Sequence, residues 1–185
     1  KTGKDSLGVI NLLKAAEIDT TKKDLYGDVG AAYLKMKKYP EAIVNYNKKI
    51  AASAKPSAND YSKLGTAYYY SNDFINADSA FVKITRSNPE LPFGYLWRAK
   101  ANSHIDPKNE KWLAKPYYET YISKITPEDT EKNKRDLVEA NTYMGVYYMN
   151  KKDFANAKVY FKKVQELDPN NPNAKKFLSS PEANK

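Results

Sequence analysis

The sequence lacks cysteine altogether and has a single histidine, His104, among its 185 residues. Without cysteine the chain cannot form disulfides, thiolate metal sites or a cysteine nucleophile. No G-x-S-x-G motif is present for His104 to serve, and no glycine-rich phosphate loop occurs. The carboxylates at Asp106, Glu110, Glu128 and Asp129 do not follow the calcium-loop pattern. We therefore expect a protein that is not an enzyme, with no catalytic residues, no metal and no cofactor.

Long apolar runs are also missing. None approaches the roughly 18 residues that span a bilayer, so no transmembrane segment is expected. No signal peptide is visible, but the chain starts at Lys1 rather than methionine, and we expect a processed or trimmed start. The location stays open. The absence of cysteine and a surface rich in Lys, Tyr and Asn slightly favour an exported or periplasmic bacterial protein over a cytoplasmic one.

Arginine is scarce although the formal net charge is +9. Only Arg86, Arg98 and Arg135 are arginine among the 31 basic residues. Proteins that read nucleic acid depend on arginine for bidentate contacts with bases and phosphates. Lysine interspersed with 22 acidic residues is typical of a solvated surface. We therefore expect no nucleic-acid partner.

A pattern of small and aromatic residues recurs along the chain. It appears in "KLGTAYYYSNDFINADSAF" (63–81) and again, 80 residues later, in "YMGVYYMNKKDFANAKVYF" (143–161). The stretch "YGDVGAAYLKMKKYPEAIVNY" has the same residue types 35 residues before the first of these. In a further stretch Ala99 takes the position held by Gly30, Gly65 and Gly145. Such repetition is the sequence mark of arrays built from one supersecondary unit.

Each unit is predicted to be a pair of helices. In the second unit, apolar residues recur at i, i+3, i+4 and i+7 before a Ser-Asn-Asp turn, and at i, i+4 and i+7 after it. Asp73 ends that turn and is expected to cap the second helix. Glycine inside a helix costs about 1 kcal/mol relative to alanine. We therefore expect a close contact at Gly65, with the small Ala77 of the partner helix facing it and with Tyr68 and Phe81 around it.

The period near 34 residues, the helix–turn–helix pattern and the spacing W-x2-L-G-x2-Y, A-x3-F and proline resemble the tetratricopeptide repeat. The second unit matches through Tyr61, Leu64, Gly65, Tyr68, Ala77, Phe81 and Pro89. The resemblance implies an all-α fold, a right-handed superhelical α-solenoid of bacterial type. We expect a single array over 1–185, with more repeats upstream. It consists of a half repeat at 1–22, repeats at 23–57, 58–91, 92–137 and 138–171, and a capping helix or tail at 172–185.

The third unit departs from the pattern. Fifteen residues separate Ala99 from Ala114, where the other units have twelve, so a longer inner turn is predicted around "DPKNEK". Pro116 is predicted to delay or kink the next helix. The extra residues before Gly145 predict longer helices or a longer loop through "TPEDTEKNKRD". After this unit and the next, the segment "NPNAKKFL" is expected to form a capping helix over the last repeat, with Phe177 and Leu178 covering it.

In this family the first helices line a concave surface, and residues beside the core stripe point into it. The rule predicts a partner groove of Lys35, Ser62, Thr66, Tyr69, Tyr70, Leu96, Lys100, Thr142, Val146 and Met149. Tyr69 and Tyr70 exceed what packing at Tyr68 requires, and surplus aromatic surface suits recognition. The alternative is that one of them packs against a neighbouring unit.

Some family members clamp a chaperone C-terminal carboxylate with Lys, Asn and Arg on adjacent first helices. The matching positions here are Gly27, Ala31, Lys63 and Asn59 in one pair of units, and Ser62, Thr66, Trp97 and Phe93 in the next. This set does not form the clamp, so no chaperone-tail carboxylate clamp is expected.

The resemblance implies a non-catalytic protein–protein interaction module, or scaffold, that binds a peptide or partner protein on its concave face. The identity of that partner is not predicted. One alternative is an envelope ligand-binding module that stacks glycans on its exposed tyrosines. Another is nucleic-acid binding along an edge of lysines near the inner turns, although plain solubility is the favoured interpretation of these lysines. They are Lys35, Lys37, Lys38, Lys108, Lys111, Lys151 and Lys152.

Overall fold

The computed structural model describes residues 24–184 and, ahead of them, residues 8, 10–12, 14–15 and 18. Every regular element among these residues is a helix, which confirms the all-α prediction. Most of the expected half repeat at 1–22 lies outside them. The chain forms two compact units, Lys1–Pro89 and Glu90–Lys185, and each is described by itself.

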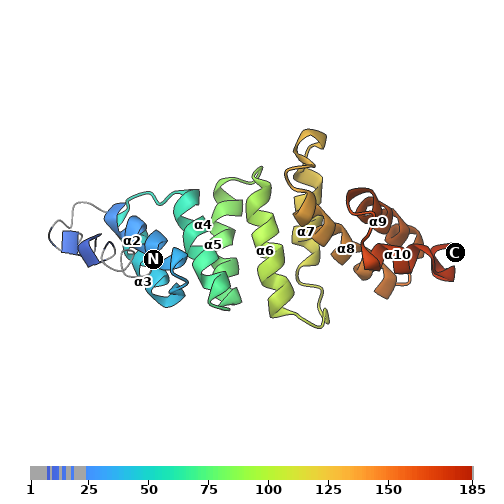
Figure 1. Cartoon of the computed structure of the whole chain (residues 1–185), viewed down its shortest axis with the longest axis horizontal. Coiled ribbons are helices and arrows are strands. Elements are labelled where there is room, and N and C mark those ends of the chain that lie inside the picture. Colours follow the sequence, from blue (N-terminus) through green and yellow to red (C-terminus); the bar gives the residue numbers. More distant parts are fainter. Residues whose placement is uncertain (1–7, 9, 13, 16–17, 19–23, 185) are drawn as a thin grey trace. The chain divides into compact units, whose positions relative to one another are not determined.

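Helices follow one another in pairs in both units (Figure 1). The first unit holds α2 (Asp24–Lys35), α3 (Tyr39–Ala52), α4 (Ala58–Tyr70) and α5 (Phe74–Ser87). The second holds α6 (Pro92–Ile105), α7 (Lys115–Lys124), the 3-10 turn η1 (Pro127–Asp129), α8 (Lys134–Asn150), α9 (Phe154–Leu167), α10 (Pro172–Leu178) and η2 (Pro181–Asn184). The pairs α2–α3, α4–α5, α6–α7 and α8–α9 pack as hairpins.

An aromatic ring lies directly over the helical glycine in three hairpins. A Cβ added to Gly65 would be 2.7 Å from the Phe81 ring, and one added to Gly145 would be 2.9 Å from the Phe161 ring. The Gly30 position faces Tyr46 in the same way, at 2.8 Å. These rings are almost completely buried. The close contact at Gly65 and the presence of Phe81 in it were expected, but the atoms nearest to the glycine belong to the Phe81 ring rather than to Ala77.

The tight hairpins share one turn geometry. In the turns 36–38, 71–73 and 151–153, the middle residue has a positive φ: Lys37 at 59°, Asn72 at 63° and Lys152 at 57°. The next backbone N–H then donates to a tyrosine carbonyl five residues earlier, at 2.9 Å in all three turns. This is the Schellman pattern that ends many helices.

The second helix of two hairpins starts with the same cap. The carboxylate of Asp73 accepts from the backbone N–H of Asn76 at 3.2 Å, as predicted for this residue, and from the Asn76 side chain at 2.7 Å. Asp153 and Asn156 repeat both bonds 80 residues later. Capping of this kind stabilises a helix by about 1 kcal/mol.

The third hairpin departs from the repeat pattern in the ways that the sequence predicts. Its inner turn covers 106–114, against three residues in the other hairpins, and α7 begins only at Lys115, so Pro116 delays the helix rather than kinking it. The extra residues before Gly145 take both predicted forms, because α8 is long, with 17 residues, and η1 lies in the connecting loop.

Across the residues that the structure describes, no helix combines the length and apolar character needed to cross a membrane.

The positive φ at Lys152 predicts a stabilising substitution. Lysine is strained in the left-handed region, whereas glycine adopts it freely, so Lys152→Gly should raise the free energy of unfolding by about 0.5–1 kcal/mol. The matched control is Lys162→Gly within α9, which should lower it by about 1 kcal/mol. Both tryptophans, Trp97 and Trp112, lie in the second unit, so urea unfolding followed by tryptophan fluorescence reads this part of the chain. Effects of the same sign would contradict the assignment.

The ring over Gly145 predicts that Gly145→Ala destabilises the second unit. Overpacking costs roughly 1–3 kcal/mol, while the better helix propensity of alanine returns about 1 kcal/mol. The expected net loss is therefore about 1 kcal/mol, measured by the same urea titration. The penalty of alanine should shrink in the Phe161→Leu background, where the ring is gone. A gain in stability from Gly145→Ala alone would show that the ring does not limit this position.

Candidate functional site

The capping helix α10 closes the second unit. Its N-cap is Asn171, whose side-chain oxygen accepts from two following backbone N–H groups at 3.1 and 3.3 Å. The buried ring of Phe177 lies with its centroid 4.9 Å from that of Phe161, and Leu178 is partly buried against the same cluster. The predicted cover of the last repeat is therefore present, and it brings α10 close to α8 and α9.

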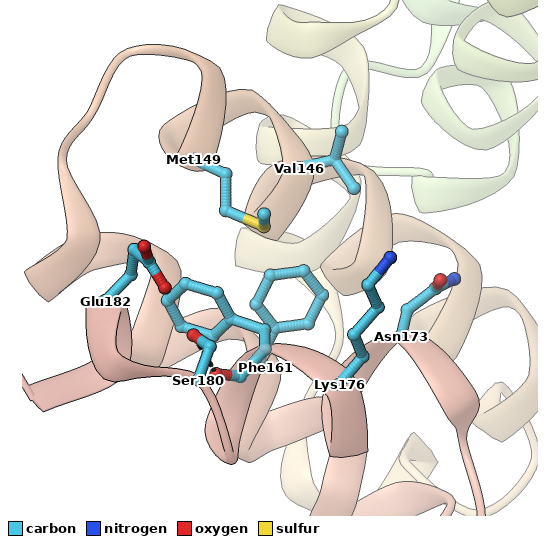
Figure 2. A pocket seen from close by; sticks show the side chains of 8 residues that line it. Val146, Met149, Phe161, Asn173, Lys176, Ser180 and Glu182 are labelled. Atoms are coloured by element: carbon cyan, nitrogen blue, oxygen red, sulfur yellow. Dashed lines mark hydrogen bonds between the residues drawn. The ribbon is translucent and has the colours of Figure 1, made fainter.

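A pocket of about 300 Å³ opens where α8, α9 and α10 meet. Figure 2 shows Val146 and Met149 on one side, Phe161 at the base, and polar side chains at the two ends. The lining residues are Val146, Met149, Phe161, Asn173, Lys176, Phe177, Ser180 and Glu182. The Ser180 hydroxyl donates to the Phe177 carbonyl at 2.7 Å. An apolar base with polar groups at its rim is typical of a recognition pocket.

A second, wider hollow adjoins this pocket along α8, because Val146 lines both. Its walls come from α6, the 106–114 turn, α7, α8 and the start of α10: Ser103, Asn109, Tyr118, Arg135, Val138, Glu139, Thr142, Tyr143, Val146 and Asn171. Of the predicted groove residues, Thr142 and Val146 therefore line the hollow, and Val146 and Met149 line the adjoining pocket.

The hydroxyl groups in the wall of this hollow include those of Ser103 and Thr142, which have no hydrogen-bond partner among the described residues. The oxygens Ser103 Oγ and Thr142 Oγ1 are buried and unpaired within the described residues. Most buried polar side-chain atoms in proteins have a partner, and an unpaired one costs about 1–3 kcal/mol. The hollow thus contains unused hydrogen-bonding capacity on two neighbouring first helices.

A polar network that includes Tyr118 and Glu139 in the wall of the hollow ties α6, α7 and α8 together. The Lys100 ammonium lies 2.7 Å from Asp136 and 3.5 Å from Glu139, and the Tyr118 hydroxyl donates to Glu139. Burial alone would lower the pKa of Lys100, but the hydrogen bond to Asp136 and the two carboxylate charges outweigh it and raise that pKa. Lys100 was predicted to line the groove. In the structure its ammonium group is paired with Asp136 and Glu139 of the same unit.

The 106–114 turn is organised around one carboxylate. Asp106 accepts from the backbone N–H groups of Glu110 (2.9 Å), Lys111 (3.0 Å) and Leu113 (3.4 Å). Burial raises the pKa of Asp106, but these backbone hydrogen bonds outweigh it and hold the pKa below its ordinary value of 3.8. The same turn presents Asn109, at a φ of 55°, to the hollow.

The predicted tyrosines of the first unit pack on other rings. Tyr70 stacks on Tyr39 of the preceding hairpin with centroids 5.8 Å apart. Tyr69 meets Tyr70 edge-on at 5.7 Å and Phe74 at 5.4 Å. The alternative interpretation therefore holds for Tyr70, although its side chain remains 51% exposed. The rings already serve as packing partners for one another.

The remaining groove residues are distributed unevenly. Lys35 is exposed, while Ser62 and Thr66 are partly buried on α4. Leu96 does not belong to a groove: it is only 5% exposed and lies in the core with Ala99, Tyr118 and Met144. The prediction failed because the packing of α7 and α8 around α6 covers Leu96. His104 is exposed near the end of α6, as expected.

Several lining residues were not predicted. Arg135 and Val138 continue the stripe of Thr142 and Val146 back along α8 at helical spacing, which the sequence does contain. The α10 side chains Asn173 and Lys176 join the pocket only because the capping helix folds against α9. Within the described part of the chain, no group of three or more His, Cys, Asp or Glu side chains could hold a metal ion.

The Asp106 carboxylate predicts a pH-dependent difference between the native chain and Asp106→Asn. The asparagine turns an NH2 group towards backbone donors, so the variant should have a lower urea midpoint at neutral pH. Folding lowers the pKa of Asp106, so its carboxylate stabilises the folded state above pH 3.8. This stabilisation is lost as the pH falls through the lower pKa of the folded state. Urea titrations from pH 7 to pH 3, followed by tryptophan fluorescence, should show the difference shrinking below 3.8. A constant difference would refute this role.

Helix hairpins with a repeated small-residue and ring contact, closed by a capping helix, define a helical-repeat protein. The model of the tetratricopeptide repeat family matches residues 138–171. The C-terminal part of a TPR repeat-containing protein from Cytophaga hutchinsonii is similar with a TM-score of 0.86 and 37% identity, over 97% of this chain and 69% of that one. The chain belongs to the tetratricopeptide repeat family. Such folds are protein–protein interaction scaffolds and are generally non-catalytic.

More distant structures share the fold. MamA is similar with a TM-score of 0.71 and 21% identity, over 91% of each chain. YrrB, described as a TPR protein with an unusual peptide-binding site, has a TM-score of 0.71 and 16% identity, over 95% of this chain and 84% of that one. The comparison with curated protein sequences gave no match. The glycan-binding alternative receives no support from these relatives.

Proposed function

We propose that this chain is a non-catalytic interaction module that holds a segment of a partner protein against α8 and the capping helix. The observation that carries the proposal is the joined lining of the apolar pocket and the wider hollow, which share Val146. Three of its residues, Thr142, Val146 and Met149, are those at which the family pattern places a partner groove. A peptide-binding member of the same fold, YrrB, is consistent with this use.

The lining favours a protein segment over a small charged ligand or nucleic acid. Its deepest part is apolar, with two phenylalanine rings and the side chains of Val146 and Met149. Recognition of protein segments commonly combines such an apolar anchor site with a polar rim. The lysines near the inner turns, by contrast, are not part of this lining, so a nucleic-acid partner is not proposed.

The proposal predicts that Met149→Glu abolishes partner capture. A carboxylate in the apolar pocket would lose solvation when a partner covers it. The matched control is Val159→Glu, because Val159 is also exposed, at 50% against 38% for Met149, but lies on α9 outside the pocket. Affinity capture from cells that make the protein, with quantitative mass spectrometry, should recover the partner at least tenfold less with Met149→Glu and unchanged with Val159→Glu.

Equal recovery with both variants and the native chain would contradict the proposal. So would an equal loss with both, since that result would indicate a general effect on folding or charge. Urea unfolding of each variant checks that the second unit is intact.

A further inference from the structure

The lining residues on α8 follow one another along one side of the helix, and their chemistry changes from one end to the other. This change indicates what kind of peptide segment the lining binds. Arg135, Val138, Thr142, Val146 and Met149 follow one another at spacings of three or four residues, so they form one stripe of the helix. We call these five residues the α8 track. The apolar pocket lies at its C-terminal end, the unpaired hydroxyls near its middle and basic side chains at its N-terminal end.

The apolar end suits a single large side chain. The pocket has a volume of about 300 Å³, which has room for one bulky side chain. It is too small to take in a whole α-helix, whose diameter with side chains is about 10–12 Å. A bulky aliphatic or aromatic side chain can enter between Met149 and Phe161, with its backbone near the polar rim at Asn173 and Ser180 (Figure 2).

The middle of the track favours an extended backbone. Ser103 Oγ and Thr142 Oγ1 are buried and unpaired within the described residues. Because both oxygens are buried, a side chain would have to rotate about χ1 to present its hydroxyl to a peptide in the hollow. An extended peptide offers free N–H and C=O groups to such hydroxyls, while the backbone groups of a helix are already bonded to one another.

Three basic side chains, Lys132, Lys134 and Arg135, lie at the N-terminal end, in a depression that Glu131 and Asp168 also line. Glu131 is paired with Lys134 at 3.4 Å, and Glu139 accepts from Tyr118 and lies 3.5 Å from Lys100. Across the residues that the structure describes, Arg135 has no ion pair of this kind. Arg135 lines both the hollow and this depression. The Asp168 carboxylate already accepts from Asn170 and Asn171, and a guanidinium suits the carboxylate of a partner.

We propose that the α8 track binds an extended peptide segment with a bulky apolar residue in the α8–α10 pocket and an acidic residue at Arg135. The inference rests on the proposed function and specifies its partner. Along the helix axis, Arg135 is separated from Val146 by about 16 Å and from Met149 by about 21 Å, at 1.5 Å per residue. An extended chain advances about 3.3 Å per residue, so the acidic residue lies about five or six positions from the apolar one.

The test is selection of a random dodecapeptide library, displayed on phage, against the full chain. Enriched sequences should contain Leu, Ile, Phe, Met or Trp and, about five or six positions away, Asp or Glu. Fluorescence polarisation of one enriched peptide should then show at least tenfold weaker binding when its apolar residue is changed to serine. Changing its acidic residue to the corresponding amide should weaken binding about fivefold.

Two variants locate each end of the peptide. Met149→Glu should abolish binding, whereas Arg135→Gln should weaken it about fivefold and make the peptide and its amide analogue bind equally. The control Arg86→Gln removes the same charge from α5, in the first unit, and should leave affinity unchanged. Binding with the same affinity in Arg135→Gln, or enrichment without the spaced pair, would overturn the peptide chemistry.

Failure of this inference can be told apart from failure of the proposed function. Enriched peptides of another pattern that still require Met149 would overturn the spaced pair and leave the interaction role standing. An absence of enriched peptides would overturn the inference, while partner capture lost with Met149→Glu would still support the role. Sedimentation showing a dimer that Met149→Glu dissociates would assign the pocket to a second copy of the chain and overturn the peptide proposal.

Discussion

Three hairpins depend on an aromatic ring that occupies the space above a helical glycine. The ring follows its glycine by sixteen residues in each, as in Gly65 and Phe81. A β-carbon at the glycine would overlap the ring, so the helix accepts a residue of poor helix propensity in exchange for close packing. The small and aromatic residues recur along the chain because the same contact between two helices is formed in each of these hairpins.

The third hairpin shows what happens when this spacing changes. Ala99 replaces the glycine, and the buried ring of Tyr118 comes nineteen residues later. The inner turn lengthens, and Pro116 places the start of α7 after it. The core is nevertheless continuous through Ala99, Ala114 and Tyr118. A repeat can thus absorb extra residues at its turn while keeping its central contact.

Most of the helices, the cap at Asp73, the long inner turn and the capping helix could be predicted, because each depends on residues close in sequence. The partner of Gly65 could not, since which side chain covers it depends on how two helices pack. The burial of Leu96 has the same origin. The exact repeat boundaries, and the single array over the whole chain, stay predictions.

The candidate site was predicted in part. Thr142, Val146 and Met149 followed from their place beside the core stripe of a first helix. Arg135 belongs to the same stripe but lies beyond the usual length of a first helix, because α8 is extended. Lys176 and Asn173 reach the pocket through the fold of α10 on α9, which no local pattern in α8 contains.

The turn at 106–114 also offers a place for engineering. Its conformation relies on one carboxylate with its backbone donors and on the Trp112 ring, which packs on Tyr143 and Tyr147. Sequence can therefore vary at exposed positions such as Lys108 and Lys111 while the loop keeps its anchor. A foreign recognition loop grafted there would stand beside the α8 track and widen the specificity of the scaffold without disturbing its core.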